Sequence, residues 1–113
     1  MEVIVIEEHI SHYPNPLDLK AGEQLKLGRI DDEYPNWIFA TTQSGVKGWV
    51  PVQYVERVKQ SSVGLLTQDY DAYELNTILN EKLQVLFELN SWYRVSRSNG
   101  EIGWIPVHSV QEV

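Results

Sequence analysis

The sequence predicts an all-β fold made of two small five-stranded barrels in tandem. Three observations predict it: apolar and polar residues alternate over short segments, helical periodicity is missing, and the second half of the chain repeats the first. Each half lies near the lower size limit for a domain that folds unaided, because the whole chain has 113 residues. Four Trp and six Tyr compensate, since one aromatic side chain buries roughly 150–250 Å² in a small core.

The repeat is clearest in one motif that ends each half. Residues 48–58, Gly-Trp-Val-Pro-Val-Gln-Tyr-Val-Glu-Arg-Val, recur 55 positions later as Gly-Trp-Ile-Pro-Val-His-Ser-Val-Gln-Glu-Val. Trp37 and Trp92 keep this offset, whereas Leu17 and Leu75, further upstream, are 58 positions apart. The difference places a longer loop before Trp37 in the first repeat, and surface loops tolerate such insertions.

Five strands are expected in each half, separated by turns and loops. The expected ranges are 3–6, 23–30, 37–42, 46–51 and 55–58 in the first half, and 64–67, 81–88, 92–97, 101–106 and 110–113 in the second. A polar stretch without periodicity lies between the halves and is typical of a linker. We therefore expect a first barrel at residues 1–58, a linker at 59–64 and a second barrel at 65–113.

Composition narrows the classes of partner. The formal charge is −7, from 16 acidic and 9 basic residues without a basic cluster, so nucleic acid is not an expected partner. The chain has no Cys, which excludes disulfides and thiolate metal sites. Its first residues are acidic, and their apolar run is too short for a signal peptide or a membrane span. We therefore expect a cytoplasmic protein without membrane contact.

Two motifs resemble those of the Src homology 3 (SH3) domain. Residues 17–25, Leu-Asp-Leu-Lys-Ala-Gly-Glu-Gln-Leu, are similar to the strand that follows the family's long RT loop. Residues 48–55 are similar to its Gly-aromatic-Ile/Val-Pro-x-x-Tyr-Val motif, and the second half looks like a bacterial variant SH3 domain, with Asp69 to Leu75 and Gly103 to Pro106. The resemblance implies SH3-like barrels with an aromatic groove that holds proline-rich segments as polyproline II helices.

The resemblance also implies the residues that line the grooves. These peptide-binding candidates are Trp37, Trp49, Pro51, Tyr54, Tyr70, Trp92, Trp104 and Pro106. Packing inside the barrel is the alternative for each, and we favour it for Trp49 and Trp104, which lie where the family usually has an edge Tyr. Indole rings serve both in binding hot spots and in cores.

Each repeat departs from the family's groove at one end. Glu7, Glu8 and His9 stand where the first repeat would carry its tyrosine-bearing motif, and Ser109 replaces the last groove Tyr of the second repeat. Tyr54 thus belongs only to the first repeat and Tyr70 only to the second. Two diverged modules are therefore expected rather than two identical proline readers.

The expected function is a non-catalytic adaptor that binds a protein or peptide, with weak affinity for proline-containing or basic segments at two sites that reinforce each other. Acidic loop residues such as Asp31 and Asp32 either select a basic ligand residue or are simply solvated. No metal site is expected, because His9 and His12 are not joined by the further protein ligands that zinc requires. No enzyme activity or cofactor is expected either. Two alternatives stay open: a bacterial cell-wall (peptidoglycan) binding module, and a structural scaffold in which the two barrels pack together.

Overall fold

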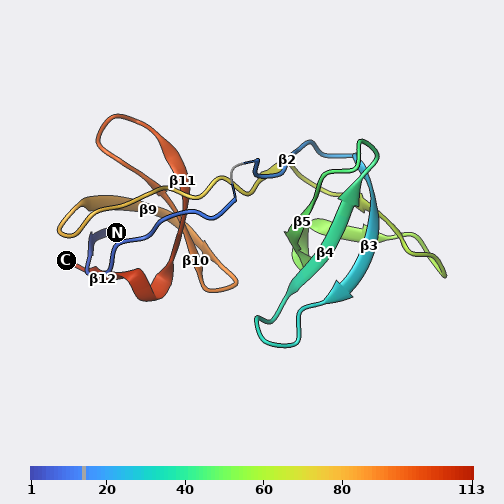
Figure 1. The fold of residues 1–113 in the computed structure, drawn as a ribbon, viewed down its shortest axis with the longest axis horizontal. Coiled ribbons are helices and arrows are strands. Elements are labelled where there is room, and N and C mark those ends of the chain that lie inside the picture. The colour runs from blue at the N-terminus through green and yellow to red at the C-terminus, as the bar shows by residue number, and fades with distance from the viewer. Residues whose placement is uncertain (14) are drawn as a thin grey trace. The chain divides into compact units, whose positions relative to one another are not determined.

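The structure is a computed structural model that describes residues 1–13 and 15–113 (Figure 1). The chain forms two compact units. The terminal unit contains Met1–Pro14 and Tyr73–Val113, and the central unit contains Asn15–Ala72. Each unit has one five-stranded sheet with antiparallel pairing. The predicted fold class, two five-stranded SH3-like small barrels, is confirmed.

The central unit arranges its sheet in the order β5-β4-β3-β7-β6. Its strands are β3 (Gln24–Ile30), β4 (Trp37–Thr42), β5 (Lys47–Pro51), β6 (Val55–Arg57) and β7 (Val63–Leu66). A second, two-stranded sheet pairs β2 (Asp18–Leu19) with β8 (Tyr70–Asp71). A 3-10 helix, η1 (Val52–Tyr54), joins β5 to β6. Alternate apolar residues point inward, as the period of two along a strand requires.

The terminal unit has the equivalent order β11-β10-β9-β1-β12. Its elements are β1 (Glu2–Val5), β9 (Lys82–Leu89), β10 (Trp92–Ser96), β11 (Ile102–Pro106), η2 (Val107–Ser109) and β12 (Val110–Glu112). The core consists of Val3, Val5, Leu75, Leu83, Val95, Ile105 and Val110. Two of these, Val3 and Val5, are only 1% exposed and come from the first strand of the chain.

The first strands of the two repeats are exchanged between the units. Strand β1 opens the first repeat but pairs with β9 and β12, which belong to the second. Strand β7 opens the second repeat but pairs with β3 and β6 of the first. In Figure 1 the blue N-terminal strand accordingly runs among the orange and red strands of the terminal unit. We call this arrangement the first-strand exchange.

The expected linker at 59–64 does not join the two units. The Val58 N–H donates to the Val63 carbonyl at 2.8 Å, and Gln60 adopts a positive φ of 59°. The segment is therefore the turn of a β6–β7 hairpin inside the central unit. The expected boundaries, 1–58 and 65–113, differ from the units because polarity marks a surface turn as well as a linker. The chain instead passes between the units after residue 14 and after residue 72.

Two strand glycines allow a leucine to approach the sheet. A Cβ atom at Gly48 would lie 2.8 Å from Leu17 Cδ1, and one at Gly103 would lie 2.7 Å from Leu75 Cγ. Leu17 and Leu75 are 3% and 0% exposed, so these contacts are part of the cores. The repeated glycine of the C-terminal motif therefore serves close packing.

Candidate functional site

The central unit brings four of the expected groove residues together. Trp37, the first residue of β4, lies directly opposite Pro51 on β5. Helix η1 follows Pro51 and ends at Tyr54. The Tyr54 ring meets the Tyr70 ring edge-on, with centroids 5.9 Å apart and an interplanar angle of 77°. We call these four residues the aromatic site.

The aromatic site has two half-buried and two buried members. Trp37 and Tyr54 are half-buried, whereas Pro51 and Tyr70 are buried. The Tyr70 hydroxyl donates to the Trp49 carbonyl at 3.4 Å, which ties β8 to β5. Edge-to-face contact between the tyrosines adds to their area burial. Tyr70 therefore packs against Tyr54, and Trp37 and Tyr54 keep part of their apolar surface exposed.

Trp49 and Trp104 each lie in a cluster with one phenylalanine and one arginine. Trp49 meets the Phe39 ring at 5.2 Å and the Arg29 guanidinium at 5.1 Å. The corresponding centroid distances at Trp104 are 5.6 Å for Phe87 and 5.2 Å for Arg94. Both indoles thus have aromatic and cation–π partners within the barrel. Trp104 is only 5% exposed, whereas Trp49 is half-buried, and their packing inside the barrel stays a prediction.

The terminal unit places a different set of residues at the equivalent positions. Trp92 lies opposite Pro106, as Trp37 does opposite Pro51. His9 pairs with Thr77 as Tyr70 pairs with Leu19, and its ring meets Trp92 edge-on at 5.7 Å. The His9 Nε2 atom is hydrogen-bonded to Glu74 Oε1 at 2.7 Å.

Ser109 replaces the second tyrosine in the terminal unit. Its side chain is 1% exposed, and its hydroxyl donates to the Pro106 carbonyl at 2.7 Å. The hydroxyl therefore closes η2 internally and offers no ring to a ligand. The terminal unit keeps the Trp and Pro of the groove, but its tyrosine pair is lost.

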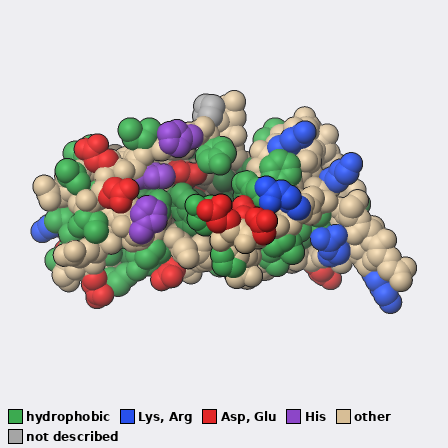
Figure 2. Space-filling model, turned by 60° about the horizontal axis from the view of Figure 1, so that its bottom comes forward, with side chains coloured by type: hydrophobic (Ala, Val, Ile, Leu, Met, Phe, Trp, Pro, Cys, Tyr) green, Lys and Arg blue, Asp and Glu red, His purple; other side chains and the backbone are tan. Residues whose placement is uncertain are grey.

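Histidines give the terminal unit its own surface chemistry. Figure 2 shows the three histidines of the chain gathered on one face. His108 Nδ1 lies 3.8 Å from Glu7 Oε2, and both side chains are largely exposed. Among residues 1–13 and 15–113, no group of three or more His, Cys, Asp or Glu could hold a metal ion.

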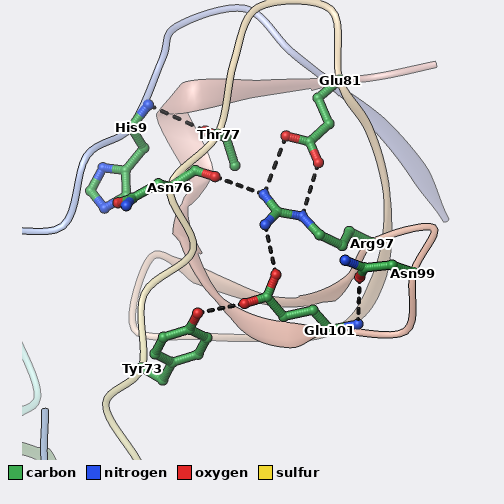
Figure 3. A network of polar contacts seen from close by, with 8 residues as sticks. All are labelled: His9, Tyr73, Asn76, Thr77, Glu81, Arg97, Asn99 and Glu101. Carbon is green, nitrogen blue, oxygen red and sulfur yellow. Dashed lines mark hydrogen bonds and ion pairs between the residues drawn. The ribbon is translucent and has the colours of Figure 1, made fainter.

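A polar network around Arg97 fixes the long loop of the terminal unit (Figure 3). The guanidinium contacts Glu81 Oε2 at 3.0 Å and Glu101 Oε1 at 2.7 Å, and it donates to the Asn76 carbonyl at 2.7 Å. The Tyr73 hydroxyl donates to the other Glu101 oxygen. That hydroxyl and the Arg97 guanidinium lower the pKa of the Glu101 carboxyl. The network holds residues 73–81, and with them Glu74 beside His9.

The acidic loop before β4 is organised by its own backbone. The Asp31 carboxylate accepts the N–H groups of Glu33 and Tyr34 at 2.8 and 3.1 Å. These bonds lower the pKa of the Asp31 carboxyl. Elsewhere in the central unit, Asp69 accepts the Ala21 N–H at 2.9 Å. One carboxylate oxygen of each residue is thus used in shaping a loop, and the charge stays at the surface.

One of the candidate groove residues, Tyr70, lies in a different barrel from the one expected. Sequence reasoning assigned Tyr70 to the second repeat's groove, and the structure places it beside Tyr54 of the first repeat. It also missed the His9–Glu74 pair as part of a site. The histidine in the tyrosine-motif position was visible, but its partner lies 65 residues away and has no local signal.

The central unit is a small antiparallel barrel with half-buried Trp and Tyr beside a strand-ending proline, an arrangement consistent with SH3-type binding modules, which are generally non-catalytic. Residues 3–58 match the family model of the variant SH3 domain. The matched segment contains β1 but ends before β7, so it differs from the central unit at both ends. Comparison with curated proteins and with solved structures gives no match. No helix among the described residues is long and apolar enough to cross a membrane.

Proposed function

We propose that the central unit is a peptide-binding module and that its aromatic site holds a proline-containing segment. The observation that carries the proposal is the Tyr54–Tyr70 ring contact beside the Trp37–Pro51 pair. Together they supply the Trp, Pro and two Tyr that a polyproline II ligand packs against in SH3-type recognition. Such a ligand is already extended, so binding costs it little conformational entropy.

Charge favours a ligand that also carries Lys or Arg. The chain has a formal charge of −7. Asp69 and Asp71 flank Tyr70 in sequence, and Asp32 and Glu33 are exposed in the loop before Trp37. Acidic loops on either side of an apolar site speed encounter with a cationic segment more than they strengthen the complex.

The terminal unit is proposed as a second SH3-type module with a different ligand preference. Its His9–Trp92 contact and its buried Ser109 replace the tyrosine pair. The chain would act as an adaptor if both units bound segments of one partner. The tether would then raise the effective concentration of the second segment at the second site. A cytoplasmic location stays a prediction from the sequence.

A peptide array tests the proposal with the full chain as probe. The array carries proline-rich peptides, each with and without Lys or Arg, and scrambled versions of each. We expect the proline-rich basic peptides to be retained, and Trp37→Ala to weaken their binding about 30-fold or more, the effect of losing a hot-spot residue.

Trp92→Ala is the matched control, because Trp92 has the equivalent position in the terminal unit. It should leave binding of the same peptides within about twofold of the unsubstituted chain, since surface changes away from the site cost little. Equal losses for both variants, or binding of scrambled peptides as strong as of proline-rich ones, would show that the aromatic site does not read proline.

A further inference from the structure

We propose that ligand recognition by the central unit requires both repeats, because the sizes of Val3 and Gly64 select the first-strand exchange that delivers Tyr70 to Tyr54. The inference deepens the proposed function and rests on it for the role of the aromatic site. Strand selection itself rests on packing alone.

The two first strands occupy equivalent positions in their sheets. Val3 lies opposite Leu83, and Gly64 lies opposite Leu25, the residue that corresponds to Leu83 in the other repeat. Further along the same strands, Val5 lies opposite Val110 and Leu66 opposite Val55. Backbone pairing would therefore accept either strand in either unit. Side chains must decide which strand enters which sheet.

Gly64 is required where it lies. A Cβ atom there would be 2.7 Å from Val55 Cγ1 and 2.8 Å from Leu27 Cδ1, and both of those side chains belong to the central unit. If β1 took the place of β7, Val3 would fall on this position with a whole isopropyl group. The core would be overpacked, and close-packed interiors do not absorb added carbons freely.

Val3 is required in the terminal unit for the opposite reason. It is 1% exposed and belongs to the core cluster, against which Val85 packs. Val85 corresponds to Leu27 of the first repeat, so the terminal unit has two valines, Val3 and Val85, where the central unit has Gly64 and Leu27. If β7 took the place of β1, Gly64 would leave a cavity of about the volume of a valine side chain, which costs transfer and packing free energy.

The exchange has a direct consequence for the aromatic site. Strand β7 leads into β8, which carries Tyr70, and β1 leads toward His9. With the exchange, Tyr70 meets Tyr54, and His9 meets Trp92. Without it, His9 would stand beside Tyr54, and Tyr70 would stand beside Ser109. Neither unit would then have the tyrosine pair.

Cysteine pairs in the full chain can report which first strand lies next to β3. The chain has no native Cys, so no other thiol competes with an introduced pair. Gln24→Cys with Leu65→Cys tests the exchanged pairing, because these residues are opposite each other and exposed. Gln24→Cys with Ile4→Cys tests the unexchanged pairing. Opposite residues in antiparallel strands lie within disulfide range.

The same two cysteine pairs are then placed in the double variant Val3→Gly/Gly64→Val, which reverses the side-chain sizes. In the unsubstituted background we expect the 24–65 disulfide to form at least about tenfold more than the 4–24 disulfide, because overpacking and a cavity both oppose the alternative. In the double variant the preference should reverse. Should the double variant not fold, Gly64→Ala alone should raise the yield of the 4–24 disulfide.

Several results would overturn the inference. They are a dominant 4–24 disulfide in the unsubstituted background, a disulfide-linked dimer with either pair, and a cross-linking preference that none of the size changes alters. The readout contains no ligand. Failure of every peptide to bind would therefore contradict the proposed function and leave strand selection standing, and a failure of cross-linking would do the reverse.

Discussion

Tyr54 and Tyr70 come from different repeats of the chain, yet their rings meet at 5.9 Å in one barrel. In the terminal unit, Ser109 has the position that corresponds to Tyr54, and His9 has the position that corresponds to Tyr70. Each repeat therefore carries one of the two groove tyrosines. Because the first strands are exchanged, the two tyrosines meet in the central unit, and the terminal unit has neither. The pairing of β1 and β7 decides which unit receives Tyr70 and which receives His9. The two units therefore have different candidate binding surfaces.

The first prediction concerns the leucine contacts at the strand glycines. Gly103→Ala should lower the free energy of unfolding of the terminal unit by about 1–3 kcal/mol, the usual cost of overpacking a core. Its Cβ would lie 2.7 Å from Leu75 Cγ and 3.0 Å from the Tyr73 carbonyl, and the backbone atom cannot move easily. Urea unfolding followed by tryptophan fluorescence measures the change.

Gly28→Ala is the control for that measurement. A Cβ at Gly28 would lie 3.4 Å from its nearest neighbours, which is ordinary contact. The substitution should change stability by less than about 1 kcal/mol, since it mainly restricts the unfolded chain. An equal loss for the two variants would mean that close approach of Leu75 is not what Gly103 provides.

The second prediction concerns the fragment that folds. Residues 15–72 contain every strand of the central unit, and residues 1–58 replace β7 by β1. The fragment 15–72 should unfold cooperatively. It should be more stable than the fragment 1–58 by at least about 1–3 kcal/mol, because in 1–58 Val3 would overpack the position that Gly64 occupies in the central unit. Thermal unfolding by circular dichroism compares them. Greater stability of 1–58 would favour an unexchanged barrel.

The third prediction is a pH dependence from the Arg97 network. The Tyr73 hydroxyl and Arg97 hold the pKa of Glu101 below its ordinary value of 4.5, so the folded state binds the proton less readily than the unfolded state. This contribution to stability is complete above pH 4.5 and is lost as the pH falls through the lowered value. Glu101→Gln should therefore flatten the acid limb of a plot of urea midpoint against pH.

Alkaline pH should act on the other partner of the same bond. The Glu101 carboxylate raises the pKa of Tyr73 above its ordinary value of 10.0. The bond therefore contributes fully below pH 10.0 and is lost as the pH rises through the raised value. Tyr73→Phe should remove that alkaline loss. An unchanged pH profile in both variants would show that this exposed bond has no measurable effect on stability.

Much of the fold could be predicted from sequence because it depends on local pattern. Alternation and the repeated motif located the ten strands of the two five-stranded sheets to within a few residues, and β4 was predicted at its observed bounds, but the short strands β2 and β8 were missed. Which barrel each first strand joins could not be read in this way, because β1 and β7 fit the same backbone pairing. The signal that distinguishes them is side-chain size: Val3 lies in the core on which Val85 packs, whereas Gly64 leaves room for Leu27. This signal can be recognised only once the strand register is known.

The aromatic site shows the same limit. Its four residue types were expected from the motifs, but their assembly depends on Tyr70 crossing from the second repeat. His9 packs on Trp92, and a contact between residues 9 and 92 leaves no local signal in the sequence. Burial of Ser109 and Tyr70 likewise follows from tertiary packing rather than from residue type.

We propose that Tyr70 of the second repeat completes the binding site of the first. The most direct test titrates the full chain with a decaproline peptide and follows the indole N–H signals of Trp37 and Trp92 by NMR, for the unsubstituted chain, Tyr70→Leu and His9→Ala. Leucine keeps apolar bulk in the core but removes both the ring contact with Tyr54 and the hydroxyl that donates to the Trp49 carbonyl. We expect the Trp37 signal to shift in the unsubstituted chain and in His9→Ala, and Tyr70→Leu to weaken binding about 30-fold. Retained affinity in Tyr70→Leu, or loss of affinity only in His9→Ala, would contradict this proposal.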